Sequence, residues 1–143
     1  MFTGKITMDY YTKHNVSEQE YKMHSVGERL GYAPRIISYN AAAKTLTTEL
    51  IKPMCIADMY GDKASDVPPH IWPKIKKIVS DLYRHGFEYV DITGYNFIED
   101  SKQRVWIVDF GHCRPIGENH EPNAFVHSFI HNASFIGWNP DFK

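Results

Sequence analysis

The stretch YVDITGYNFIEDSKQRVWIVDFG, residues 89–111, decides how this chain is expected to fold. Two apolar runs, residues 96–100 and 105–110, flank the polar turn SKQR and predict two strands joined as a hairpin. Asp91, Asn96 and Asp109 stand at the rims of these segments. Each of them alone is typical of a turn, because Asp and Asn side chains hydrogen-bond to nearby backbone groups. Three of them around one hairpin require a further explanation.

The segments before this hairpin alternate between strand and helix patterns. Alternating apolar residues predict a strand over residues 5–11, and residues 15–32 predict a helix that begins at a capping box of Ser17 and Glu20 and ends at Gly31. Two further strands are predicted as an antiparallel pair over residues 33–40 and 44–51. A connector (52–54), a short helix (55–61), a loop (61–70) and a long helix follow. The apolar residues of the long helix recur at helical spacing: Ile71, Ile75, Ile78, Val79 and Leu82.

The motifs around the hairpin resemble those of protein kinase-like folds. DITGYN, residues 91–96, matches the catalytic-loop pattern of Asp, Leu, three free positions and Asn, with Ile92 in place of Leu, and DFG stands at residues 109–111. Asp91 precedes Asn96 by 5 positions and Asp109 by 18 positions, the separation usual in that family. Thr93, where typical Ser/Thr kinases have Lys, makes the chain more similar to compact atypical kinases such as the RIO and KEOPS-complex types.

The resemblance implies a fold class and a domain organisation. The expected class is α+β, a truncated two-lobed protein kinase-like fold with a small N-terminal sheet, one helix beside it, and a reduced, mainly helical C-lobe. Residues 1–143 are expected to form a single kinase-like domain. Its N-lobe remnant would span residues 1–52 and its reduced C-lobe residues 53–143.

The resemblance also implies roles for the motif residues. Asp109 is expected to bind Mg²⁺, Asn96 to hold a second metal ion through its amide oxygen, and Asp91 to orient the attacking hydroxyl or accept its proton. Phe110 and Gly111 join the expected cofactor-binding residues. The implied cofactors are ATP and Mg²⁺. The implied reaction is transfer of the γ-phosphate to a hydroxyl, first that of Ser or Thr in a protein and second that of a small molecule.

In this family an ion pair between a strand lysine and a helix glutamate orients the phosphates. Glu20 is the expected glutamate, with Glu18 as the fallback, although Glu20 fits the capping box equally well. The strand pattern places Asp9 at the usual lysine position. Lys5 lies on the same strand face by two-residue alternation and is expected to substitute, and Lys13 is the third choice.

Departures from the family pattern leave a second function open. Tyr89 and Val90 stand where the family has His and Arg, which argues against regulation through a phosphorylated activation loop. No glycine cluster precedes the first predicted strand, so the glycine-rich cover over the phosphates is missing. Whether the chain is an active kinase therefore stays open, and a catalytically impaired pseudokinase that acts as a binding or regulatory module is the alternative.

Histidines near the end of the chain suggest a third class of function. His127 and His131 are four positions apart, a spacing that can present two imidazoles on one helix face to a metal ion, and His112, Cys113 and His120 are close in sequence. A zinc-binding small domain is therefore a further alternative. The gaps follow no finger or ribbon pattern, which favours ordinary polar histidines.

Composition limits the expected partners. A formal net charge of −1, with scattered basic residues, favours neither nucleic acid nor an anionic membrane, and the apolar runs are far shorter than the roughly 20 residues that span a bilayer. Two cysteines are too few for a disulfide framework, so a cytoplasmic location is expected. The expected partners are a nucleotide and a protein substrate or partner kinase. A homodimer or a larger partner is expected if the aromatic residues Phe135, Trp138 and Phe142 are exposed instead of packed on the core.

Overall fold

The structure, a computed structural model, describes residues 9–52, 54–116 and 123–139. Its elements, in chain order, are β1 (Tyr10–Lys13), α1 (Glu18–Arg29), β2 (Ile36–Asn40), β3 (Thr45–Glu49), α2 (Ile56–Tyr60), α3 (Trp72–Arg84), β4 (Phe87–Tyr89), β5 (Phe97–Glu99), β6 (Val105–Ile107), β7 (Cys113–Pro115) and α4 (Ala124–His131). Two short 3₁₀ helices, Ala64–Asp66 and Pro69–Ile71, lie in the predicted loop. The α+β class is confirmed, and β4, β7 and α4 are additions to the predicted elements.

A three-stranded antiparallel sheet with α1 beside it forms the first half of the chain. The strand order is β1–β3–β2, so the β2–β3 hairpin that the sequence predicts is confirmed. β1 reaches Lys13, two residues beyond the predicted end, and pairs with β3 from Tyr10 opposite Glu49 to Lys13 opposite Leu46. Helix α1 begins at Ser17, whose Oγ accepts a hydrogen bond from the Glu20 N–H at 3.1 Å.

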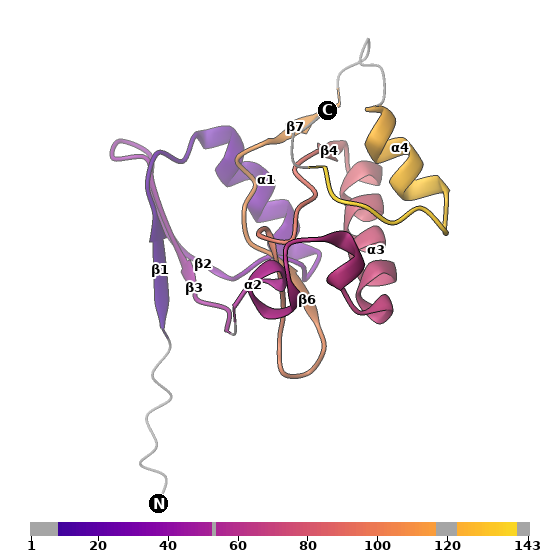
Figure 1. Ribbon diagram of the computed structural model, residues 1–143. Helices are drawn as coiled ribbons and strands as arrows, with labels where there is room; N and C mark the ends of the chain where they lie inside the picture. The colour runs from indigo at the N-terminus through magenta and orange to yellow at the C-terminus, as the bar shows by residue number, and fades with distance from the viewer. Residues whose placement is uncertain (1–8, 53, 117–122, 140–143) are drawn as a thin grey trace, which may run out of the picture.

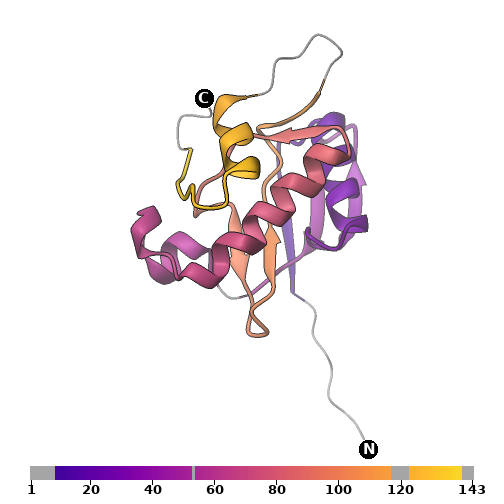
Figure 2. The ribbon, with the colours of Figure 1, turned by 90° about the vertical axis from the view of Figure 1, so that its right-hand side faces the viewer.

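The second half of the chain combines helices with two small sheets. Figure 1 shows the first sheet and α1 on one side of the molecule and α3 and α4 on the other, with the strands β4 to β7 between them. Figure 2 shows α4 lying across α3. The pairs β5–β6 and β4–β7 are both antiparallel. In the described part of the chain, no helix combines the length and apolar character needed to cross a bilayer.

Helix α3 supplies the centre of the core. All five apolar residues that the helical spacing selects are buried, with exposed fractions of 0–1%: Ile71, Ile75, Ile78, Val79 and Leu82. Removing such side chains from water is the largest favourable contribution to folding, worth about 1.5–3 kcal/mol for each fully buried residue. The helix therefore provides the rigid support on which the hairpin and the final segments of the chain pack.

The segment after residue 111 is fastened to this support by polar and aromatic contacts. The carboxylate of Glu88 in β4 is completely buried and accepts hydrogen bonds from Arg114 in β7 and from the backbone N–H of Asn123, the residue that caps α4. Phe135 and Trp138 pack against the core, as the first of the two alternatives for the aromatic residues requires. Phe142 lies outside the described residues.

Phe110 joins the two halves of the molecule beneath α1. Its ring is fully buried and lies near His24 and Tyr89, with centroid distances of 5.2 and 6.0 Å. A Cβ atom built on Gly27 would lie only 2.6 Å from Phe110 Cζ and 3.2 Å from the Cβ of Ala33. Gly27 is thus required by the close approach of the ring to the helix.

Replacing Gly27 by Ala tests this contact. Alanine stabilises an isolated helix by about 1 kcal/mol relative to glycine, whereas overpacking a core costs about 1–3 kcal/mol. We expect the overpacking to exceed the helix preference, so that Gly27→Ala lowers the free energy of unfolding measured in urea. Lys22→Ala on the exposed face of α1 serves as the control and should leave it nearly unchanged. A gain in stability for Gly27→Ala would show that the Phe110 ring moves to make room for the methyl group.

Asp81 in α3 ties that helix to the segment between α1 and β2. Its carboxylate accepts hydrogen bonds from Tyr32 Oη at 2.5 Å and Lys77 Nζ at 2.9 Å, and it is ion-paired with Arg84. Burial alone would raise the pKa of Asp81, but these three donors outweigh it and lower the pKa to about 2. The ionised carboxylate is therefore the form that stabilises the fold.

The acid stability of Asp81→Asn follows from this pKa. An aspartate in the unfolded chain has a pKa of about 3.9, so the stabilisation is complete above that pH and is lost as the pH falls towards 2. At pH 7 we expect Asp81→Asn to lower the free energy of unfolding by about 2 kcal/mol, a difference that should shrink between about pH 4 and pH 2. Urea titrations at several pH values measure it, with the exposed Asp62→Asn as the control. A difference that does not depend on pH would contradict the assignment.

Candidate active site

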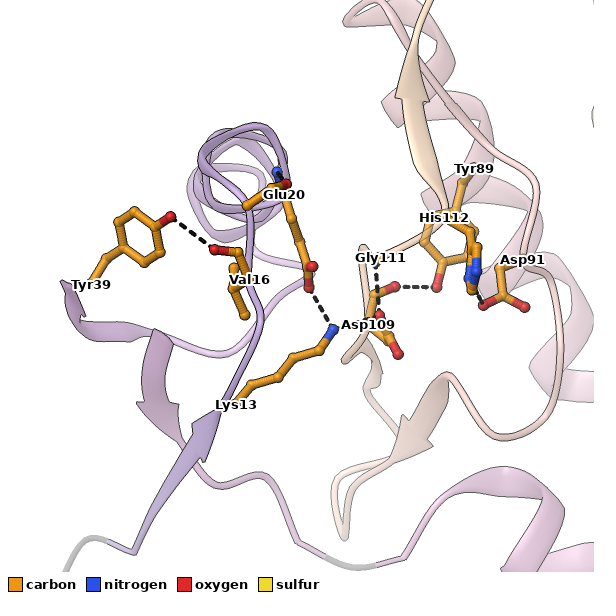
Figure 3. Close-up of polar contacts among 10 residues, drawn as sticks. Lys13, Val16, Glu20, Tyr39, Tyr89, Asp91, Asp109, Gly111 and His112 are labelled. Atoms are coloured by element: carbon orange, nitrogen blue, oxygen red, sulfur yellow. Dashed lines mark hydrogen bonds and ion pairs between the residues drawn. The ribbon is translucent and has the colours of Figure 1, made fainter. Parts of the chain in front are cut away.

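Lys13 connects β1 and α1 to the segment that carries Asp109. Lys13, at the end of β1, donates hydrogen bonds from Nζ to Glu20 Oε2 on α1 at 2.5 Å and to Asp109 Oδ1 at 2.8 Å. Figure 3 shows the lysine side chain reaching from the strand into the space between α1 and the segment that carries Asp109. Its side chain is 26% exposed, so the ammonium group still borders solvent. Of the two interpretations of Glu20, the geometry shows the ion pair, because its carboxylate bonds to Lys13.

The register of the sheet selects Lys13. Residues directly opposite each other in an antiparallel pair point to the same face, and Lys13 lies opposite Leu46, which is 2% exposed. Lys13 therefore points inward. Asp9, the residue that the sequence pattern places at the lysine position, is instead ion-paired with Lys52. Lys5, the sequence-based choice, lies outside the described residues.

The charge of Lys13 is held by its two acceptors. Burial alone would lower the pKa of Lys13, but the hydrogen bonds to Asp109 and to Glu20 outweigh it and raise the pKa above its usual value. The side chain is thus a fixed cation at neutral pH. Such a group can attract an anionic ligand at the border between the two halves.

Backbone and side-chain contacts fix the position of Asp109. Its Oδ1 also accepts a hydrogen bond from the Gly111 N–H at 2.7 Å, and its backbone carbonyl accepts one from Tyr89 Oη at 2.5 Å (Figure 3). Tyr89 is completely buried, and this burial raises its pKa well above the usual value. The phenol therefore remains protonated and can donate its hydrogen bond to Asp109.

Asp91 and Asn96 form a compact loop next to this segment. Asn96 donates from Nδ2 to the Asp91 carbonyl at 2.9 Å, and its own carbonyl accepts a hydrogen bond from the Val108 N–H at 2.9 Å. This second bond joins the loop to the residue just before Asp109. The carboxylate of Asp91 contacts His112 through an Oδ2–Nδ1 distance of 3.1 Å (Figure 3). Asp91 and Asn96 are each 7% exposed.

A close approach of α2 supports the same loop. The N–H of Ala57 donates to the Gly94 carbonyl at 2.9 Å. A Cβ atom on Gly94 would lie 3.0 Å from the Cβ and 3.1 Å from the backbone nitrogen of Ala57. Because backbone atoms cannot move aside as a flexible side chain can, a larger residue at position 94 would push α2 away from the loop.

A cleft of about 300 Å³ lies between the first sheet and the β5–β6 hairpin. Leu50, Ile98 and Val108 give it apolar walls, and Lys13 and Asp109 line its polar end. Apolar walls with a few converging polar groups are typical of sites for small organic ligands. The arrangement therefore suits a ligand with a flat apolar part and an anionic part.

The structure brings together most of the residues that the sequence selects. Asp109, Gly111 and Glu20 surround Lys13, and Asp91 and Asn96 lie in the adjoining loop. Gly111 is close enough that a Cβ atom built on it would lie 3.7 Å from Lys13 Nζ. Phe110 differs from the others because it is buried beneath α1 and is absent from the lining of the cleft between the sheet and the hairpin. We therefore propose that Phe110 supports the site through packing.

Sequence reasoning missed the functional surroundings of two site residues. The sequence marks Tyr89 only as a departure from the family pattern, yet its hydroxyl donates a hydrogen bond to the backbone carbonyl of Asp109. His112 belongs with the tail histidines by its position in the sequence, yet it contacts Asp91. The adjacency of His112 to the DFG motif was the one available signal, whereas nothing in the sequence predicts the contact of Tyr89.

The described residues do not support a zinc centre. Within them, no group of three or more His, Cys, Asp or Glu side chains could hold a metal ion together. The rings of His127 and His131 do lie side by side, with centroids 4.5 Å apart. Cys113 is buried in β7, and burial raises the pKa of its thiol to about 12, which disfavours the thiolate that zinc needs. His120 lies outside the described residues.

Comparisons with known proteins support a kinase-like fold. No family model matches the chain. The solved structure of the kinase PK-1 of Cydia pomonella granulovirus superposes with a TM-score of 0.62 at 16% identity, over 77% of this chain and 45% of that protein. A stretch of 48 residues, 34% of the chain, is 31% identical to 3-deoxy-D-manno-octulosonic acid kinase of Vibrio parahaemolyticus serotype O3:K6 and spans 20% of it. The chain thus matches less than half the length of either protein.

At this level of identity the structural likeness establishes the fold alone. The described elements are those of a small kinase-like α+β fold, with the sheet and α1 preceding the connector after β3 and a largely helical part following it. The predicted fold class is therefore confirmed. The roles of individual residues rest on the geometry of the site.

Replacing Tyr89 by Phe tests how Asp109 is held. The change removes one hydroxyl and leaves the Asp109 carbonyl without this donor, which should cost about 1–2 kcal/mol of unfolding free energy. Urea unfolding measures the loss. Tyr10→Phe removes a hydroxyl from a tyrosine that is 58% exposed and should have almost no effect. Equal stability of the two variants would mean that the contact contributes nothing.

Proposed function

We propose that the protein is a kinase-like phosphotransferase that binds ATP with Mg²⁺ and transfers the γ-phosphate to a hydroxyl group. The observation that carries this proposal is the position of Lys13 Nζ, which bonds to Glu20 and Asp109 from opposite sides of the border between the two halves. A fixed cation beside a metal-binding carboxylate suits the phosphates of a nucleotide. The apolar walls of the adjacent cleft suit the base.

The oxygen donors near Lys13 fit a magnesium ion. Mg²⁺ prefers carboxylate and carbonyl oxygens, and Asp109 offers a carboxylate that is 39% exposed. Asn96 uses its Nδ2 to bond the Asp91 carbonyl, which leaves its amide oxygen as an acceptor. Asp109 and Asn96 would therefore hold the metal, which when bound neutralises charge on the phosphates.

Asp91 would act on the acceptor hydroxyl. It would orient that hydroxyl and accept its proton, while the oxygen of the hydroxyl forms a bond to the γ-phosphorus and ADP leaves. His112 contacts Oδ2 of the Asp91 carboxylate, so this oxygen is already oriented. Orientation of reacting groups accounts for much of the catalysis in phosphoryl transfer.

The acceptor is proposed to be a Ser or Thr hydroxyl of a protein. The likeness to the viral kinase PK-1 supports a kinase-like fold, while the matching stretch in the 3-deoxy-D-manno-octulosonic acid kinase favours a sugar hydroxyl as the second candidate. Transfer of labelled phosphate from ATP to a Ser/Thr peptide library or to 3-deoxy-D-manno-octulosonic acid separates them. Labelling of the sugar alone would replace the first acceptor by the second.

One observation favours a binding module without turnover. Asp109 Oδ1 already accepts hydrogen bonds from Lys13 and from the Gly111 N–H, so a metal ion must share or displace these donors. If the metal ion does neither, the site would bind a ligand weakly and transfer no phosphate.

We further propose that the connector after β3 separates an N-lobe from a C-lobe in one kinase-like domain.

A thermal titration with ATP and Mg²⁺ tests the proposed site. A ligand that binds only the folded protein raises its melting temperature, so ATP with Mg²⁺ should stabilise the protein more than either alone. At a ligand concentration of 100 times Kd the gain is about 2.7 kcal/mol. Asp109→Asn should remove the dependence on Mg²⁺, and Lys13→Met should weaken ATP binding at least 10-fold because the fixed cation is lost.

The matched control for the lysine is Lys22→Met. Lys22 is 69% exposed on α1 and has only a long contact of 3.8 Å with Glu18, so its removal should leave ATP binding unchanged. Failure of ATP with Mg²⁺ to stabilise the wild-type protein would overturn the phosphotransferase. Stabilisation without labelled phosphate transfer to any acceptor would instead support the binding module.

A further inference from the structure

We propose that Asn139, far from every kinase-like motif in the sequence, is the positioning residue that fixes the backbone of Asp91. Its side-chain Nδ2 donates a hydrogen bond to the Val90 carbonyl at 2.8 Å, and its backbone N–H donates one to the Ile92 carbonyl at 2.7 Å. These two carbonyls belong to the residues on either side of Asp91. The inference rests on the proposed function for its catalytic consequence, but the contact itself can be tested separately.

The position of these bonds limits the motion of Asp91. Asn139 is 5% exposed, and Val90 and Ile92 are 3% and 0% exposed. Water therefore cannot easily replace the two N–H donors of Asn139 at these buried carbonyls. The Val90 carbonyl belongs to the peptide group directly before Asp91, and the Ile92 carbonyl belongs to the peptide group that starts one residue after it. The Asp91 carbonyl between them accepts a hydrogen bond from Asn96 Nδ2. Because the backbone is held at all three carbonyls, the direction of the Asp91 Cα–Cβ bond is restrained.

A contact with the side chain itself complements this backbone restraint. His112 lies 3.1 Å from Asp91 Oδ2, so it holds the carboxylate from the side of the DFG segment. Asn139 acts on the backbone on both sides of Asp91, through its hydrogen bonds to the Val90 and Ile92 carbonyls. Because a displacement of about 1 Å can lower a rate 100-fold, two such restraints on one carboxylate are of direct consequence for turnover.

Aromatic packing explains how Asn139 reaches this loop. The preceding residue, Trp138, lies against Trp72 at the start of α3, with ring centroids 4.6 Å apart. Earlier in the same segment, at the end of α4, the carbonyls of Phe129 and Asn132 accept hydrogen bonds from Lys76 of α3. Both contacts are made with α3, the most deeply buried helix. The segment is therefore held on a rigid support immediately before Asn139.

The test combines hydrogen exchange with steady-state kinetics on the full chain. In Asn139→Ala, we expect the amides of residues 89–96 to exchange at least 10-fold faster, while those of α3 keep the wild-type rate. With Mg²⁺ and water as the acceptor, kcat for ATP hydrolysis should fall at least 10-fold. KM for ATP and the ATP-induced thermal stabilisation should stay within 2-fold, because Lys13 and Asp109 are untouched.

Two further variants make the result decisive. Asn132→Ala removes an exposed asparagine whose side chain, within the described residues, accepts hydrogen bonds only from Ser134 in its own turn, and it should behave as wild type. Asn139→Ser keeps a polar side chain, so it retains a measurable fold if the alanine variant does not, and it should show the same selective increase in exchange. The positioning role predicts the split between kcat and KM, whereas a purely structural role would raise exchange in α3 as well.

The possible outcomes separate this inference from the proposed function. Wild-type exchange rates over residues 89–96 in both Asn139 variants would overturn the inference and leave the proposed function standing. Faster exchange over both this loop and α3, with kcat and KM changed together, would also overturn it. Absence of ATP stabilisation in the wild-type protein would overturn the proposed function and the catalytic part of the inference, whereas the exchange data alone would still decide the backbone contact.

Discussion

The ammonium group of Lys13 is the interaction on which the arrangement of the candidate site depends. It holds two carboxylates, from Glu20 on α1 and Asp109 after β6, within 2.8 Å of one nitrogen. Without the lysine, these carboxylates would face each other in a partly buried space and repel. Removing one partner of such a cluster is costly because it leaves uncompensated charge, even where the intact cluster adds little net stability. A cationic group at this position therefore follows from the fold as well as from the proposed chemistry.

Packing beneath the lysine keeps its partners in place. Phe110 fits under α1 only because Gly27 has no side chain, and its ring lies near His24, whose Nε2 is 2.9 Å from the Pro34 carbonyl. Burial lowers the pKa of His24 despite this contact, so the neutral imidazole is favoured and Nε2 acts as the donor. A neutral ring suits a position beside Phe110. The apolar layer and the charged layer above it are thus consistent with each other.

Much of the fold could be predicted because its signals are local. The cap at Ser17, the spacing of apolar residues in α3 and the turn between β5 and β6 each depend on a few neighbouring residues. The selection of Asp91, Asn96 and Asp109 rests on spacing within 18 positions around a single hairpin, which is also a local signal. The strands β4 and β7 are as short as β5 and β6, but no turn next to them in the sequence joins them, because their pairing connects segments 26 positions apart. A pairing over that distance has no local signal in the sequence.

The sequence by itself determined which side chains could bear a charge, the cap at which α1 begins, the buried face of α3, and that three oxygen-bearing residues surround one hairpin. Only the tertiary structure decided which lysine joins them. The sequence pattern left Lys5 and Lys13 as candidates, and the register of β1 against β3 places Lys13 opposite the buried Leu46. The tertiary structure likewise decided that Asn139 meets the backbone of Val90, 49 positions away in the chain. The physical reason is that periodicity specifies the face on which a residue lies, whereas long-range contacts are specified by how complete elements pack.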